Sequence, residues 1–216
     1  MATAKEVFDS ARAVYLNDAG GQVFTDSVLL PHLKEAHRDL QLHLLINGLP
    51  VIREKSDVIP VVALSTELTL PADFIEAISL KERGSSSDEW VSMTEKDFEP
   101  DYQQSTTLIF WCNRDEKIML VGATTNREVL LRYNKGLTLP KDETSQMGFR
   151  LAEVFLAAQT AQYAARALGS DSLADDCLKA AELKLDLVVR ANIKGQQSLP
   201  VRRIPYRRYR RSGLAF

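Results

Sequence analysis

The hydrophobic residues of this chain change their spacing twice. Near both ends they recur every three or four residues, as in an amphipathic helix, whereas between about residues 51 and 140 they fall in short Val-, Leu- and Thr-rich runs typical of strands. A helix with a single apolar stripe must bury it against another element, so the two helical ends must pack on each other across the central block. The sequence therefore predicts an α+β fold: a bundle of about four helices, a β-rich insertion between the second and third helices, and an extended C-terminal arm.

Two helices are predicted before the central block. The first covers about residues 4–17 and ends before the glycine pair at 20–21, which supplies left-handed backbone. The second begins at one of three candidate N-caps, residues 25–27, and ends near residues 47–50. Pro31 fits this helix only in the first turn, where its missing N–H would have no helical partner anyway. The apolar stripe of the second helix consists of Leu33, Ala36, His37, Leu40 and Leu44.

The central block is predicted to hold short strands. Residues 113–116 (Asn-Arg-Asp-Glu) separate two of them and are typical of a hairpin turn, and residues 84–88 form a Gly- and Ser-rich loop. The candidate strands cover residues 59–70, 74–80, 90–93, 107–112, 117–122 and 127–133.

Two further helices are predicted after Pro140. Residues 145–168 are rich in alanine, and because small side chains let helices approach closely, we expect this helix at the centre of the bundle. Gly169 fits the left-handed position that follows a helix. Residues 172–175 (Ser-Leu-Ala-Asp) resemble a capping box for the last helix, which runs to about residue 193. The chain thus divides into N-terminal helices (1–50), a β-rich insertion (51–140), C-terminal helices (141–195) and an extended basic arm (196–216).

The sequence contains no recognisable motif for catalysis or metal binding. His32, His37 and His43 all fall on the second predicted helix, where His32 and His43 would lie about 16 Å apart along the axis and His37 points elsewhere. Acidic residues cluster at 88–89 and 95–101, in a polar stretch typical of a solvated loop. No nucleophile elbow, Walker loop or Rossmann fingerprint occurs. We therefore predict no metal, no cofactor and no enzymatic role, and keep open a hydrolase with a perturbed carboxylate pair.

The cysteines and the apolar runs indicate where the chain can reside. Cys112 and Cys177 have no Cys-x-x-Cys partner, which favours reduced thiols packed as small core residues in a cytosolic setting. No run of about 18 apolar residues occurs, so we expect no membrane-spanning helix and no membrane partner. The N-terminus lacks the hydrophobic segment of a secretory signal.

Charge is divided unevenly along the chain. The 27 basic and 29 acidic residues give a net charge of −2. Six of the basic residues, all arginines, lie within residues 202–211, so the arm segment carries +6 and the rest of the chain −8. An acidic body with a basic end is typical of a protein that binds a partner through that end.

Three interpretations of the arm remain open. It is a solvated tail, or a nucleic-acid-binding segment with arginines on phosphates and Tyr206 and Tyr209 stacked on bases, or a segment that becomes ordered on a protein partner. We favour the third, in which the tyrosines act as anchors and the arginine forks pair with acidic side chains. The predicted partner-binding residues are Arg202, Arg203, Tyr206, Arg207, Arg208, Tyr209, Arg210 and Arg211.

Several short motifs, taken in order, resemble those of the head-to-tail adaptor (neck or connector) proteins of tailed bacteriophages. The order and spacing agree over nearly the whole chain. The motifs are LND at 16–18, FTD at 24–26, LLPHLKEAHRDL at 29–40, LPADF at 70–74, WVSM at 90–93, IMLVGATTNREV at 118–129 and RRIPYRR at 202–208.

The resemblance implies a structural protein of the virion neck. It implies a homo-oligomeric ring, of twelve copies, that binds the portal protein through residues 202–211 and presents its other face to tail or nozzle proteins. Genomic DNA would pass through the channel of the ring during ejection, and assembly would take place in the host cytoplasm. The alternative from another class is a nucleic-acid-binding module that uses the Arg- and Tyr-rich arm.

Overall fold

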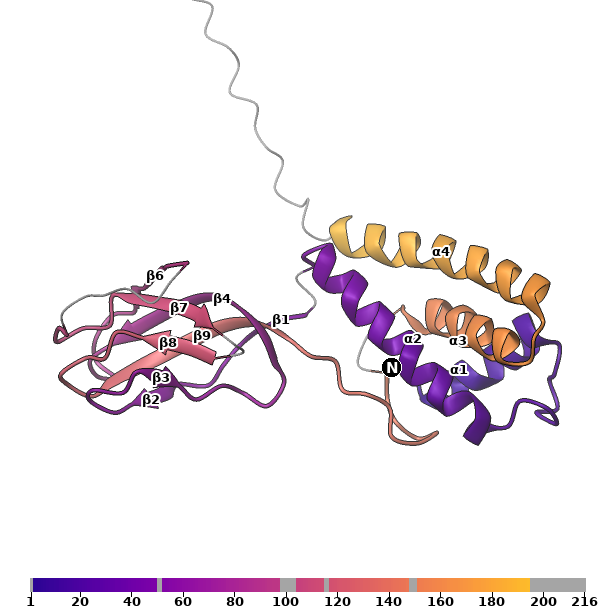
Figure 1. Ribbon diagram of the computed structural model, residues 1–216, viewed down its shortest axis with the longest axis horizontal. Helices are drawn as coiled ribbons and strands as arrows, with labels where there is room; N and C mark the ends of the chain where they lie inside the picture. The colour runs from indigo at the N-terminus through magenta and orange to yellow at the C-terminus, as the bar shows by residue number, and fades with distance from the viewer. Residues whose placement is uncertain (1, 50–51, 98–103, 115–116, 148–150, 195–216) are drawn as a thin grey trace, which may run out of the picture.

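The helical and the strand-forming parts of the chain build two lobes, each with its own hydrophobic core (Figure 1). The computed structural model describes residues 2–49, 52–97, 104–114, 117–147 and 151–194. Within these residues the chain order is three helical segments, of which the first two are continuous, then the strands, then two more helices. The predicted α+β class is therefore confirmed.

The first helix is capped by its own side chains and by a distant segment. Helix α1 (Ala4–Ser10) begins with a capping box, in which the Thr3 hydroxyl accepts from the Glu6 N–H at 3.3 Å and the Glu6 carboxylate accepts from the Thr3 N–H at 3.0 Å. The N–H groups of Ala4 and Lys5, which have no helical partner, donate to backbone carbonyls of residues 143–145 at 2.9 Å. The predicted helix continues as the π-helical segment η1 (Ala11–Leu16) and stops at Asn17, whose φ is 55°.

Helix α2 (Asp26–Ile46) corrects one prediction. Pro31 lies in the second turn and not in the first, because the helix starts five residues before it. The proline cannot donate to the Ser27 carbonyl, a loss that usually destabilises a helix interior. Leu29 and Leu33 are both fully buried on either side of the proline, so the apolar stripe begins a turn earlier than predicted and holds the helix together.

Helix α3 (Glu153–Ala167) is the centre of the bundle, as predicted. It packs against α2, α4, α1 and η1, and its alanines are buried along most of its length. The predicted start at residue 145 is wrong. Gln146 forms an antiparallel bridge with Thr3, and the Met147 N–H donates to the Ala2 carbonyl at 2.9 Å, so this stretch is extended because it pairs with the N-terminus.

The turn between α3 and α4 (Asp171–Lys194) follows the sequence prediction at one position and departs from it at another. Gly169 has φ of 76° and donates to the Arg166 carbonyl at 3.0 Å, while Ser170 donates to the Ala165 carbonyl at 3.0 Å. These two bonds form a Schellman motif, which leads directly into the next helix. Helix α4 therefore starts before Ser172, and the predicted capping box at 172–175 is wrong.

The strands form a sandwich of two sheets. One sheet has the order β1-β9-β4-β5, with β2 also paired to β9, and the other has the order β3-β8-β7-β6. Buried side chains from both sheets meet in one core around Trp111, Leu80, Ile118 and Leu131. The strands are β1 (Arg53–Lys55), β2 (Ile59–Val61), β3 (Glu67–Leu68), β4 (Phe74–Arg83), β5 (Val91–Ser92), β6 (Thr94–Glu95), β7 (Phe110–Arg114), β8 (Lys117–Leu120) and β9 (Arg127–Lys135).

One predicted strand is divided between the two sheets, and another is followed directly by a crossing to the other sheet. Residues 59–70 form β2 and β3, separated where Leu64 has a left-handed φ of 66°. Residues 90–93 give β5, and the chain then crosses at the buried Met93 to enter β6 in the other sheet. The predicted hairpin is confirmed by the antiparallel β7–β8 pair. Two residues assigned to its turn, Asn113 and Arg114, belong to the ladder instead, where they pair with Ile118 and Lys117.

Candidate docking surfaces

The predicted portal-binding residues, Arg202 to Arg211, lie outside the described residues. The helix that precedes them, α4, buries Ala174, Cys177, Ala181 and Val188 against the bundle. Figure 1 shows the C-terminal ends of α2 and α4 at the end of the bundle that is nearer to the sandwich.

Helices α2 and α4 carry exposed aliphatic pairs one turn apart. On α4, Leu183 and Leu187 are 68% and 58% exposed, on the face opposite the buried residues. On α2, Leu42 and Ile46 are 55% and 72% exposed. Isolated exposed leucines are normal, and each of these pairs places two aliphatic side chains next to each other on one helix, where they form a small exposed apolar strip.

The loop between η1 and α2 is held by two charged side chains. The Asp18 carboxylate accepts hydrogen bonds from the N–H groups of Gln22, Val23 and Phe24 at 3.1, 3.0 and 2.8 Å, and these bonds lower its pKa. The Arg12 guanidinium donates to the Phe24 carbonyl at 2.6 Å and pairs with carboxylates at both sides of the loop. These bonds keep the loop in a fixed position and present Val23, 59% exposed, to solvent.

The three histidines lie on α2, as the sequence predicts, and they do not converge. His37 is 1% exposed, and burial lowers its pKa. Burial also lowers the pKa of His32. In the part of the chain that the structure describes, no three His, Cys, Asp or Glu side chains gather to hold a metal ion.

The two cysteines are core residues of different lobes. Cys112 is 1% exposed in β7, and Cys177 is 2% exposed in α4. Burial, followed by the charge of Asp176, raises the pKa of the Cys177 thiol, so this thiol stays protonated and poorly nucleophilic at neutral pH.

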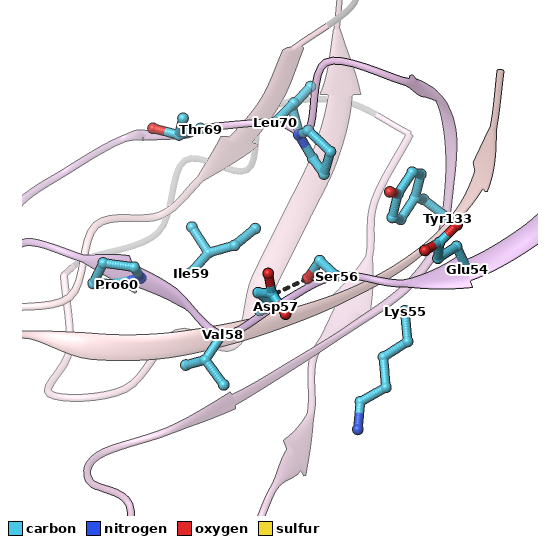
Figure 2. Close-up of a pocket in the computed structure, with 11 residues that line it drawn as sticks. Glu54, Lys55, Ser56, Asp57, Val58, Ile59, Pro60, Thr69, Leu70 and Tyr133 are labelled. Atoms are coloured by element: carbon cyan, nitrogen blue, oxygen red, sulfur yellow. Dashed lines mark hydrogen bonds between the residues drawn. The ribbon is translucent and has the colours of Figure 1, made fainter. Parts of the chain in front are cut away.

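A pocket of about 500 Å³ opens at the edge of the sandwich (Figure 2). Tyr133 forms one wall, and its hydroxyl donates to the Asp73 carboxylate at 2.9 Å. Burial, then this hydrogen bond and the charges of Asp73, Glu54 and Asp57, raise the pKa of Tyr133 to about 12. The phenol is therefore neutral at physiological pH and acts as a hydrogen-bond donor, not as a base. Figure 2 shows Ile59 and Leu70 on the other side of the pocket, away from Tyr133.

The acidic residues considered for hydrolysis that the structure describes lie on the surface. Asp88, Glu89, Glu95 and Asp97 are all exposed, and Asp88 accepts a hydrogen bond from the Ser85 hydroxyl at 3.0 Å. The remaining members of the predicted cluster, Glu99 and Asp101, lie outside the described residues. Exposed carboxylates of this kind are typical of a solvated surface.

The sequence model of one protein family, the SU10 adaptor proteins, matches residues 2–203. The chain belongs to the SU10 adaptor protein family. The match includes the bundle, the sandwich and the first two arginines of the arm, Arg202 and Arg203. Among curated proteins, no sequence matches the chain.

Membership confirms the resemblance to bacteriophage head-to-tail adaptors. This SU10 adaptor protein is thus a structural component of a phage virion, of a family that associates with portal and tail components. None of its described helices is long and apolar enough to cross a membrane.

Proposed function

We propose that this SU10 adaptor protein forms a ring beneath the portal and joins the portal to the tail or nozzle proteins. In this proposal twelve copies surround the channel through which genomic DNA leaves the capsid. The observation that carries it is the family match over residues 2–203, because that match reaches from the bundle into the basic arm. The protein acts by binding and not by catalysis.

The exposed helix pairs support association between copies. Leu183 and Leu187 on α4, like Leu42 and Ile46 on α2, expose apolar surface that a monomer leaves in water. Burying such surface between subunits stabilises an oligomer at about 25 cal/mol per Å² of apolar area. We assign the α4 pair to the contact between neighbouring copies, in which an exposed leucine of one copy meets an apolar surface of the next.

The arm is assigned to the portal. The arm carries a charge of +6 and the rest of the chain −8, so charge distinguishes the proposed portal-binding segment from the body. Arginine forks bind carboxylates in two parallel hydrogen bonds, and tyrosines fill pockets at low entropic cost. The contact residues are Arg202, Arg203, Tyr206, Arg207, Arg208, Tyr209, Arg210 and Arg211.

The four-part division of the chain also stays a prediction. Two separate cores favour boundaries near residues 50 and 140. The side chains of Ile52 and Leu137 pack with the bundle core, so the two crossings between the lobes belong physically to the bundle.

Binding of the arm to the portal is tested with two variants of the full chain. One variant lacks residues 196–216, and the other replaces the six arginines of residues 202–211 with glutamine. Both are expected to keep the circular dichroism and melting behaviour of the unaltered protein and to lose at least tenfold in affinity for purified portal. Unchanged affinity in both variants would overturn the assignment. Tight binding of the arm to DNA that falls steeply with salt would favour the nucleic-acid alternative.

A further inference from the structure

The outer face of the larger sheet carries a cluster of cations from three strands. Side chains alternate between the two faces of a strand. Leu80 of β4 and Leu131 of β9 are fully buried in the sandwich core, so their neighbours Lys81 and Arg132 point outward. In the ladder, Arg132 lies between Lys55 of β1 and Ser79 of β4, which places the three strands' outward side chains side by side.

These residues line a hollow of about 460 Å³. Among its described lining residues Glu54 alone is acidic, and its carboxylate pairs with Lys135, which lies outside the hollow. Lys55, Lys81 and Arg132 form no ion pair with any carboxylate that the structure describes. The lining residues are Arg53, Glu54, Lys55, Ser79, Lys81, Trp90, Leu130 and Arg132.

An aromatic ring is fixed beside the cations. The Arg83 guanidinium lies 4.4 Å from the centroid of the Trp90 ring and donates to the Glu128 carboxylate at 2.6 Å. Trp90 is half-buried and, with Leu130, gives the hollow an apolar patch next to its charges.

The hydrogen-bonding groups of the hollow select the class of ligand. Apart from Glu54, its charged side chains are donors only. Lys55 lies directly across from Arg132 on strands about 5 Å apart, and Lys81 lies two residues along β4 from Ser79, the other partner of Arg132. A peptide would bring one N–H per residue and find few acceptors here. A phosphodiester backbone offers closely spaced acceptors and carries no donor of its own, and its condensed counterions are released when lysine and arginine replace them.

We propose that this face of β1, β9 and β4 binds the phosphate backbone of DNA through Lys55, Lys81 and Arg132. The deoxyribose groups next to these phosphates then contact Trp90 and Leu130, and contacts to phosphate and sugar carry no sequence information. The site lies on the body of the chain, which has a net charge of −8 without the arm. The long-range electrostatic field of the body therefore repels DNA, and the attraction comes from this local cluster of cations alone. The inference is independent of the ring and of portal binding.

The experiment measures the affinity of the full chain for short duplex DNA by fluorescence anisotropy at several salt concentrations. Because the arm also carries arginines, all variants are made in a chain whose six arm arginines are replaced by glutamine. The test variant combines Lys55→Gln, Lys81→Gln and Arg132→Gln. The control combines Lys5→Gln, Lys117→Gln and Lys179→Gln, which remove the same charge from exposed positions elsewhere.

We expect the test variant to bind DNA at least tenfold more weakly than the control at low salt. Each lost phosphate contact flattens the dependence of log K on log salt by about 0.9, so the slope falls by about 2.7 in the test variant. Both variants should melt at the same temperature, since the altered side chains are exposed. Equal DNA affinity and equal slopes in the two variants would overturn the proposal. So would tighter binding of poly-glutamate than of DNA, because it would assign the hollow to an acidic protein.

Discussion

The side-chain oxygen of Gln41 in α2 accepts a hydrogen bond from the backbone N–H of Leu137 at 2.5 Å. The same amide donates to the Lys135 carbonyl at 3.3 Å. The Gln41 side chain thereby serves as hydrogen-bond partner to two backbone groups of the segment that leaves β9 and returns to the bundle. It links the two lobes across more than ninety residues of sequence.

Replacing Gln41 with alanine should loosen this link. Two hydrogen bonds are lost, each worth about 1 kcal/mol net, and the half-buried Leu137 N–H is left without a partner. Amide hydrogen exchange should show faster exchange at the Leu137 N–H, which loses its acceptor, with little change in the core of the sandwich. Gln22→Ala removes an exposed glutamine amide and serves as control. Unchanged protection at Leu137 would contradict the role of Gln41.

Much of the bundle was predictable, because its helices carry regular apolar stripes. Leu33, Leu40 and Leu44 mark α2 in the sequence and are fully buried in the structure. The start of α3 was not predictable from local pattern, since residues 145–147 are held extended by the N-terminus, which lies far away in sequence. Strand β1 gave no signal either, because all three of its residues are exposed.

The two candidate binding sites, the arm and the cation cluster on the sandwich, also differ in whether the sequence alone reveals them. The arm is a local run of arginines and tyrosines, so composition alone singles it out. The cation cluster on the sandwich is invisible in the sequence, because Lys55, Lys81 and Arg132 come together only through the register of β1, β9 and β4. Period-two alternation in β4 and β9 could have placed two of these side chains outward, but only pairing of the strands shows that they are neighbours.

Gly169→Ala should destabilise the bundle by about 1 kcal/mol. The φ of Gly169 is 76°, a conformation that disfavours a Cβ, although no atom would lie within 4 Å of it. The cost is therefore conformational and not steric. Gly20→Ala is the matched control, since Gly20 has an ordinary φ and its Cβ would meet only the Gln22 side chain at 3.7 Å. Urea unfolding of both variants measures the difference, and equal midpoints would contradict the account.

The stability of the bundle should fall as the pH drops below about 6.5. Burial lowers the folded-state pKa of His37, so the unfolded chain binds the proton more readily and protonation favours unfolding. The sign is the same for His32, whose pKa burial also lowers. His37→Leu should therefore reduce, without abolishing, the loss of unfolding free energy between pH 6.5 and pH 5. An identical pH dependence in the variant and the parent protein would show that His37 does not titrate on unfolding.

Association between copies should depend on the exposed leucines of α4. Leu183→Ser with Leu187→Ser is expected to lower the sedimentation coefficient of the assembled protein to that of smaller species and to leave the melting temperature of the monomer unchanged, because both side chains are exposed. Val62→Ser with Val91→Ser removes comparable exposed aliphatic surface from the sandwich and should leave assembly intact. Full assembly by the α4 variant would remove α4 from the subunit contact.

The most direct test of the central claim is an image of the assembled phage particle by cryo-electron microscopy. The account predicts a ring of this adaptor directly beneath the portal, with residues 202–211 of each copy against portal subunits and the tail proteins on the opposite side. A particle in which the protein lies away from the portal–tail junction would contradict the account.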